Sequence, residues 1–152
     1  METKKSIQIS YVILMIMMII ALVYAALAFV QPNLLVSRSF TLYTGISWND
    51  FLNTSPIHAH YMLILERMAG GLGFALSLGG IIVLIAIYRK GVKWAWYYIL
   101  VVGIIGWVNN LVANIMFKNS LIIIVIVVGL VLITVGLIIP AKDFLGEKKS
   151  NT

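Results

Sequence analysis

Four long apolar runs constrain this chain more than any other feature. They cover about residues 7–30, 62–88, 94–117 and 121–139, and each is close to or longer than the roughly 20 residues that a helix needs to cross a bilayer core. Inside lipid every backbone polar group must be satisfied within its own segment, which favours helices. The sequence therefore predicts an all-α integral membrane four-helix bundle, folded as one transmembrane domain over residues 1–152.

Composition supports a lipid environment. Hydrophobic residues make up 62% of the chain and charged residues 11%, whereas soluble domains average about 45–50% and about 25%. The absence of cysteine excludes disulfides, thiolate metal ligands and cysteine nucleophiles. The net charge of +6 comes from basic residues at the ends of apolar runs, so we expect contact with the lipid bilayer and no nucleic-acid partner.

The distribution of Lys and Arg predicts the orientation. One side of the predicted bundle carries eight basic residues, namely Lys4, Lys5, Arg89, Lys90, Lys93, Lys142, Lys148 and Lys149. The other side carries three, namely Arg38, Arg67 and Lys118. The positive-inside rule then places both termini in the cytoplasm of a multi-pass cell-membrane protein, with residues 140–152 as a cytoplasmic tail.

Residues 31–61 form the one long connection, which we expect outside the cell as an outer loop. Within it, Ser47 is a helix-capping residue and Asp50 stands three residues later, as at a helix start. We expect a short interfacial helix on the outer membrane surface, ended by Pro56. Its apolar face is formed by Trp48, Phe51 and Leu52.

The same segment holds the candidate metal ligands Asp50, His58 and His60, since His and Asp are common ligands of transition metals. Residues two apart share a face only in an extended segment, so this site requires residues 58–60 to be extended. The alternative is two solvated histidines at the membrane surface. Asn53 begins an Asn-Thr-Ser pattern, which is an acceptor in organisms that glycosylate their surface proteins.

Four polar residues within the second and third apolar runs are candidate ligand-binding residues. Glu66 and Arg67 either anchor the helix at the interface or line a polar pocket. Asn110 and Asn114 either bond neighbouring helices together or bind a polar substrate or quinone-like head group. Because all four fall in the outer halves of their helices, the sequence predicts one shared polar site.

Small residues are predicted to mark the helix-packing faces. Gly71, Ala75 and Gly79 recur at every fourth position of the second run. Gly103 and Gly106 lie on the face of the third run that also carries the asparagines. Small residues let helices approach closely in lipid, so we expect both rows at interfaces.

Two short sequences resemble a known group of proteins. Residues 88–97 read Tyr-Arg-Lys-Gly-Val-Lys-Trp-Ala-Trp-Tyr, and residues 45–48 read Gly-Ile-Ser-Trp. Over about residues 45–98 the chain resembles small prokaryotic four-helix membrane proteins of a loosely DoxX-like kind. The resemblance implies a four-helix bundle and carries no established activity or catalytic residue.

Two functions follow from these features. We favour a non-catalytic accessory or assembly subunit, which packs against other membrane protein subunits or its own copies through glycine-rich helices. The alternative is a membrane protein that binds a metal ion, lipid, quinone or other small molecule at the outer ends of the second and third runs. No catalytic residue is assigned.

Overall fold

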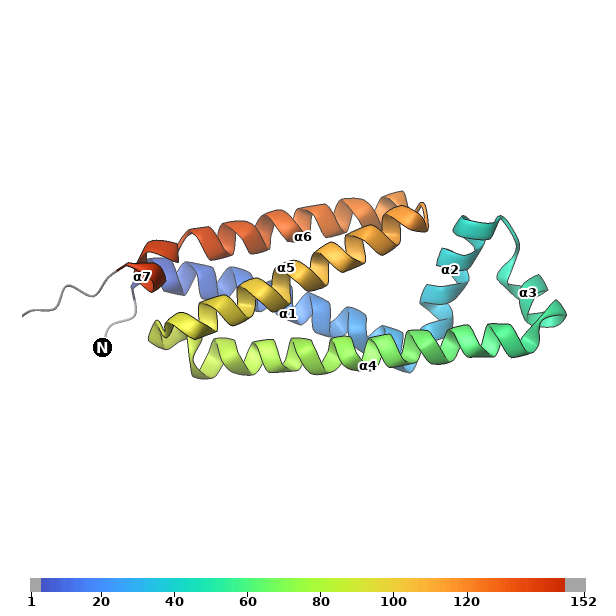
Figure 1. Cartoon of the computed structure of the whole chain (residues 1–152), viewed down its shortest axis with the longest axis horizontal. Helices are drawn as coiled ribbons and strands as arrows, with labels where there is room; N and C mark the ends of the chain where they lie inside the picture. The colour runs from blue at the N-terminus through green and yellow to red at the C-terminus, as the bar shows by residue number, and fades with distance from the viewer. Residues whose placement is uncertain (1–3, 147–152) are drawn as a thin grey trace, which may run out of the picture.

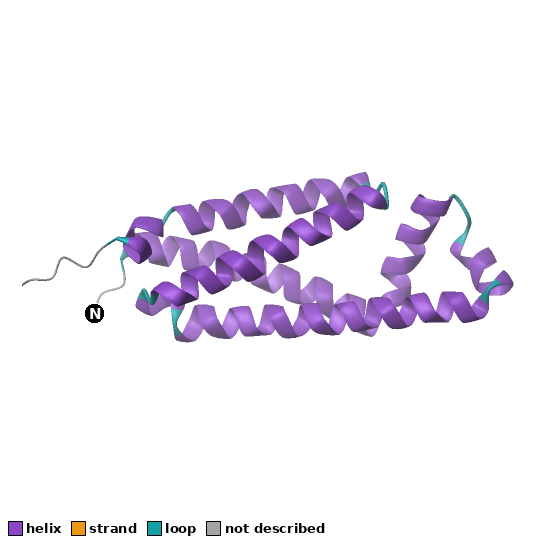
Figure 2. Ribbon diagram, in the orientation of Figure 1, coloured by secondary structure: helices purple, strands orange, loops and turns teal. Residues whose placement is uncertain are grey.

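A computed structural model of the chain describes residues 4–146, and these residues are all-α without strands (Figures 1 and 2). In chain order the elements are α1 (Lys5–Val30), α2 (Pro32–Thr44), α3 (Trp48–Thr54), α4 (Pro56–Ala86), the 3-10 helix η1 (Tyr88–Lys90), α5 (Lys93–Met116), α6 (Ser120–Ile138) and α7 (Ala141–Leu145).

Four of these helices, α1, α4, α5 and α6, are long and apolar enough to cross a membrane. At 1.5 Å per residue, the 26 residues of α1 span about 39 Å and the 19 residues of α6 about 28 Å, against a hydrocarbon core of about 30 Å. The prediction of an all-α bundle with four membrane helices is confirmed, and the protein is a multi-pass membrane protein.

The long helices run side by side between two ends (Figure 1). The N-terminus of α1, the turn between α4 and α5, and α7 lie together at one end, which we call the terminal end. The short helices α2 and α3 lie at the opposite end, which we call the α3 end. The closest long-helix pair is α1 with α4, while α5 packs mainly on α6.

Glycines bring α1 and α4 into close contact. A Cβ at Gly70 would lie 2.5 Å from the backbone nitrogen of Phe29, and one at Gly80 would lie 2.8 Å from the Met18 sulfur. Without side chains at these positions the two helices approach at backbone distance, which maximises dispersion contacts where lipid offers no hydrophobic driving force.

The packing face of α4 differs from the predicted row. A Cβ added at Gly71 would lie 3.4 Å from the Phe29 ring, which is an ordinary contact. A Cβ added at Gly79 would lie 3.2 Å from the Tyr98 hydroxyl, which is a tight one. Ala75 is exposed, so it is not buried at a helix interface among residues 4–146. A row at every fourth residue does not stay on one face, because an α-helix has 3.6 residues per turn. The row therefore drifts away from the contact face.

On α5 the two predicted packing glycines behave differently. Gly103 is buried, and an added Cβ there would lie 3.5 Å from Ile133 of α6. Gly106 is exposed and an added Cβ would meet nothing within 4 Å, so it packs against no helix among residues 4–146. The α5–α6 contact is continued by Trp107, whose ring lies over Gly129.

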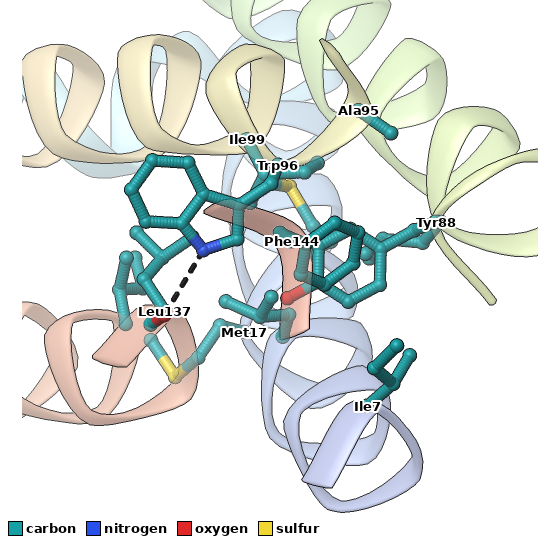
Figure 3. Packing of buried hydrophobic residues seen from close by; sticks show 12 residues of the cluster. Ile7, Met17, Tyr88, Ala95, Trp96, Ile99, Leu137 and Phe144 are labelled. Carbon is teal, nitrogen blue, oxygen red and sulfur yellow. Dashed lines mark hydrogen bonds between the residues drawn. The ribbon is translucent and has the colours of Figure 1, made fainter. Parts of the chain in front are cut away.

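The main hydrophobic core lies at the terminal end (Figure 3). Tyr88 is fully buried there, and its ring packs against Phe144 with centroids 4.8 Å apart. The Tyr88 hydroxyl hydrogen-bonds Ser10 of α1 at 2.6 Å, and the Trp96 indole donates to the Leu137 carbonyl at 2.9 Å. The first bond joins α1 to η1 and the second joins α5 to α6, in a region where unpaired polar groups are costly.

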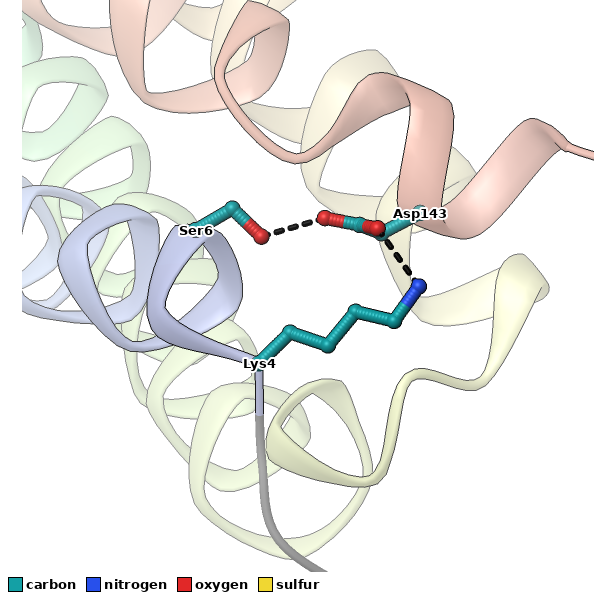
Figure 4. A network of polar contacts seen from close by, with 3 residues as sticks. All are labelled: Lys4, Ser6 and Asp143. Carbon is teal, nitrogen blue, oxygen red and sulfur yellow. Dashed lines mark hydrogen bonds and ion pairs between the residues drawn. The ribbon is translucent and has the colours of Figure 1, made fainter.

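A polar contact connects the two chain ends (Figure 4). The Lys4 ammonium donates to the Asp143 carboxylate at 2.7 Å, and Ser6 donates to the second carboxylate oxygen. Asp143 belongs to α7, which lies inside the predicted tail of residues 140–152. The tail is therefore partly helical and docked, while residues 147–152, with Lys148 and Lys149, lie outside the described residues.

Residues 31–61 are not the predicted loop. Two helices, α2 and α3, occupy most of the segment, and α4 begins at Pro56, six residues before the predicted start at 62. Proline is well accommodated in the first turn of a helix, because its missing N–H has no intrahelical partner there. Pro56 therefore opens α4, and α3 has already ended at Thr54.

The short helix predicted near Ser47 is confirmed as α3, with two differences. The Ser47 side chain makes no capping hydrogen bond. Trp48, Phe51 and Leu52 do share a face, which packs onto α2 and α4. The apolar face of α3 is therefore covered by protein.

Candidate functional site at the α3 end

A hollow lined by one acidic side chain lies at the α3 end, between α2, α4 and the end of α5. Its volume is about 330 Å³, which is at the lower end of the range of ligand pockets. We call it the Glu66 cavity. Its walls are formed by Val36, Ser39, Phe40, Tyr43, Met62, Leu65, Glu66, Ala69 and Phe117.

A small apolar cluster, which we call the cap cluster, holds α2 and α3 against α4 and so shapes this cavity. It consists of Val36, Phe40, Trp48 and Ala59, with Phe51, Leu52, Met62 and Leu63 packed around them. The Trp48 indole donates to the Asn33 side-chain oxygen at 2.6 Å, and the Phe40 and Phe51 rings stack at 4.4 Å. The cap cluster fixes the α2 wall of the Glu66 cavity.

The far wall of the cavity is aromatic. Phe117, which follows α5, meets Tyr43 of α2 edge to face, with ring centroids 6.2 Å apart. This contact links the α5–α6 pair to α2 across the α3 end of the bundle. The cavity is therefore bounded by elements that are distant in sequence.

Glu66 is the one acidic side chain that lines the cavity. It is half-buried on α4 and forms no ion pair or side-chain hydrogen bond with any residue from 4 to 146. The basic residues Arg38, Arg67 and Lys118 are all exposed. A carboxylate left without a partner among apolar side chains is costly.

Arg67 does not share the cavity with Glu66. Its guanidinium Nε donates to the Phe29 carbonyl at 3.2 Å. Arg67 instead borders a second, open hollow of about 600 Å³, which is lined by Phe29, Ile64, Arg67, Met68, Gly71 and Leu72. The helical spacing of these residues places this hollow on the opposite side of α4 from the cavity.

The asparagines of α5 do not join a polar site with Glu66 and Arg67. The Asn110 amide donates to the Gly106 carbonyl at 3.1 Å, and the Asn114 amide donates to the Asn110 carbonyl at 3.0 Å. Both bonds stay within α5, and no side-chain hydrogen bond in the described part of the chain connects either asparagine with Glu66 or Arg67. The shared site is not formed because α5 leans toward α6 rather than α4.

The predicted metal ligands are also apart. His58 and His60 lie on α4, where residues two apart diverge by about 200°, with the fully buried Ala59 between them. Asp50 is exposed on α3. Across the residues described, 4–146, no three His, Asp or Glu side chains are grouped closely enough to hold a metal ion.

One stretch of α5 presents polar and small residues to the outside of the bundle. Gly106, Asn109 and Asn110 are all exposed, and an added Cβ at Gly106 meets nothing. We call these three residues the open α5 face. Asn109 makes no side-chain hydrogen bond to any of residues 4–146, although it lies within a candidate membrane span.

The α2 and Phe117 walls of the cavity were not predicted from the sequence. The signal for the α2 wall was present, because Val36, Phe40 and Tyr43 recur at the spacing of one helix face. Nothing in the sequence pattern indicates that Phe117 contacts Tyr43. Asn119 was also missed; it is buried, and its side-chain oxygen has no partner within the described residues.

No protein-family model matches the chain, and no curated protein or solved structure is significantly similar to it. The resemblance to small DoxX-like membrane proteins therefore stays an expectation from sequence.

Proposed function

We propose that this protein is a non-catalytic accessory or assembly subunit of a larger membrane protein complex. The observation that carries the proposal is the open α5 face. Amide side chains exposed within a membrane span are costly in hydrocarbon, and they commonly bond to neighbouring helices. A partner helix seated on Gly106 would come close to the α5 backbone and bring polar groups to Asn109 and Asn110.

The burial of the long helices also supports this proposal. In the most apolar window of each span only 17–28% of the residues are buried inside the bundle. The remaining faces suit either lipid or protein neighbours.

The proposal includes an orientation. Lys4, Arg89, Lys90, Lys93 and Lys142 all belong to segments at the terminal end. By the positive-inside rule this end faces the cytoplasm, so both termini lie inside and the α3 end lies outside.

The test is purification of the tagged protein from its native membranes in a mild detergent, followed by native mass measurement. We expect recovery in a fixed ratio with larger subunits, and loss of those subunits for Gly106→Phe, which fills the open α5 face. Ile124→Phe, at an exposed position of α6, is the matched control and should keep them. Recovery of the wild type alone, or unchanged recovery for Gly106→Phe, contradicts the proposal.

A second candidate function is the binding of a small molecule, such as a lipid or quinone, at the α3 end. The Glu66 cavity favours it, because an apolar hollow with one ionisable group is typical of ligand sites. The metal-ion version has no support from the arrangement of Asp50, His58 and His60.

A further inference from the structure

We infer that the Glu66 cavity binds an amphipathic organic cation, meaning a substituted ammonium group attached to an apolar body. This activity goes beyond the accessory role and does not depend on it. The inference rests on three features of the cavity, namely its charge, its aromatic walls and its position along α4.

The site contains one acidic side chain and no basic one. Glu66 contributes the only charged side chain of the lining, and none of residues 4–146 pairs with it. Taking a carboxylate out of water is costly unless an opposite charge or hydrogen-bond donors compensate it. A cationic ligand supplies that compensation, whereas an anionic ligand would add to the cost.

The walls suit an alkylated ammonium better than a metal ion. Phe40, Tyr43 and Phe117 are aromatic, and the Tyr43 and Phe117 rings meet edge to face. Aromatic faces attract cations through their quadrupole and form the cages that recognise quaternary ammonium groups. The other walls, including Met62 and Leu65, accept the apolar body. Metal ions need several oxygen, nitrogen or thiolate ligands, which this lining does not provide.

The position of the site suits an amphipathic ligand. The last residues of α1 lie beside Gly70, where a Cβ would be 2.5 Å from the Phe29 backbone. Residues 56–69 of α4 therefore extend beyond α1, and Glu66 lies four residues, or about 6 Å, past that point. The 31 residues of α4 span about 46 Å, which exceeds the hydrocarbon core of about 30 Å. The cavity thus lies near the membrane–water boundary, where amphipathic cations accumulate.

The same ammonium chemistry occurs in free amphipathic amines and in the head groups of choline phospholipids. Both sources fit the shared lining of carboxylate and aromatic rings. The binding experiment below separates them.

The test measures binding of benzyltrimethylammonium to the full-length protein in dodecyl maltoside, a neutral detergent without ammonium groups, by equilibrium dialysis. We expect saturable binding at one site per chain. Neopentylbenzene, the neutral molecule of the same shape, should bind at least about tenfold more weakly, because it lacks the charge that Glu66 attracts. Equal binding of the two molecules to the wild type overturns the inference without any variant.

Variants then locate the site. Glu66→Gln should weaken binding of the cation by about tenfold or more, and Ala69→Phe should weaken it by filling the cavity. Asp50→Asn removes a carboxylate from the same end of the molecule but not from the cavity, so it should bind like the wild type. Circular dichroism melting confirms that each variant is folded. Wild-type affinity in folded Glu66→Gln overturns the inference.

The two ligand sources are separated by adding phospholipid to the same assay. If choline head groups occupy the site, phosphatidylcholine competes with benzyltrimethylammonium and phosphatidylglycerol does not. If free amines are the ligands, neither lipid competes. Both results support a cation site, whereas competition by phosphatidylglycerol alone contradicts it.

Discussion

At the scale of single residues, Gly70 is the position where the α1–α4 interface leaves least room. An added Cβ would come within 2.5–2.8 Å of atoms of Ala28 and Phe29, two of which belong to the α1 backbone. Backbone cannot move aside as a flexible side chain can, so the helices themselves would have to separate.

Gly70→Ala should therefore destabilise the protein by about 1–3 kcal/mol, the usual cost of overpacking. The measurement is unfolding of the detergent-solubilised protein by increasing fractions of sodium dodecyl sulfate. Gly106→Ala is the matched control, since its Cβ meets nothing and alanine favours the helix by about 0.5–1 kcal/mol. Equal stability of the two variants would show that α1 and α4 do not pack at Gly70.

Asp143 provides a second residue-scale prediction. The hydrogen bonds from Lys4 and Ser6, with the positive charge of Lys4, hold the pKa of Asp143 below its usual range. A lowered pKa means that the folded state favours the carboxylate. Its contribution to stability is present at neutral pH and is lost as the pH falls through the folded-state pKa.

Thermal unfolding of the wild type should therefore shift to lower temperature as the pH falls below about 4, and Asp143→Asn should shift less. Asp50→Asn, at the other end of the molecule, should keep the wild-type dependence. The result that contradicts this account is an identical shift for wild type and Asp143→Asn.

At the scale of elements, α2 and α3 form a unit that is separate from the main core. The cap cluster contains its own buried residues, and Trp48 is its largest, with 4% of its surface exposed. The main core lies at the terminal end around Tyr88 and Leu14. The α3 end can therefore open locally while the long helices stay together.

Trp48→Ala should release α2 and α3 from α4, because truncating a buried tryptophan costs about 3–5 kcal/mol. We expect faster hydrogen exchange and proteolysis within residues 32–54, with little change in α1 and α6. Trp48→Phe, which keeps an aromatic ring but loses the bond to Asn33, should cost about 1 kcal/mol. Trp94→Ala removes an exposed tryptophan and is the control; a uniform increase of exchange along the chain would contradict a separate unit.

The elements also show what the sequence could predict. Three of the four long helices begin and end within two residues of the predicted bounds, because apolar length in lipid depends on composition alone. Residues 32–44 were missed, since the helix α2 is only moderately apolar and is stabilised by contacts with α4. The Glu66 cavity could not be predicted in full, because the contact of Phe117 with Tyr43 depends on the tilt of α5 within the bundle.

At the scale of the whole molecule, the orientation in the membrane is testable because the chain has no cysteine. Single cysteines at Ser47, at the α3 end, and at Lys90, at the terminal end, can be labelled with a membrane-impermeant maleimide. We expect labelling of Ser47→Cys in intact cells and of Lys90→Cys only after permeabilisation. Labelling of Lys90→Cys in intact cells would reverse the proposed orientation.

The whole-molecule account holds that the open α5 face is covered by a partner helix in the native membrane. Photo-crosslinking from a benzophenone amino acid at Asn109 tests this most directly, with Ile124 on the exposed side of α6 as the matched position. The account predicts a discrete protein adduct from position 109 and none from position 124. The absence of a protein adduct at position 109, or the same adducts from both positions, would contradict it.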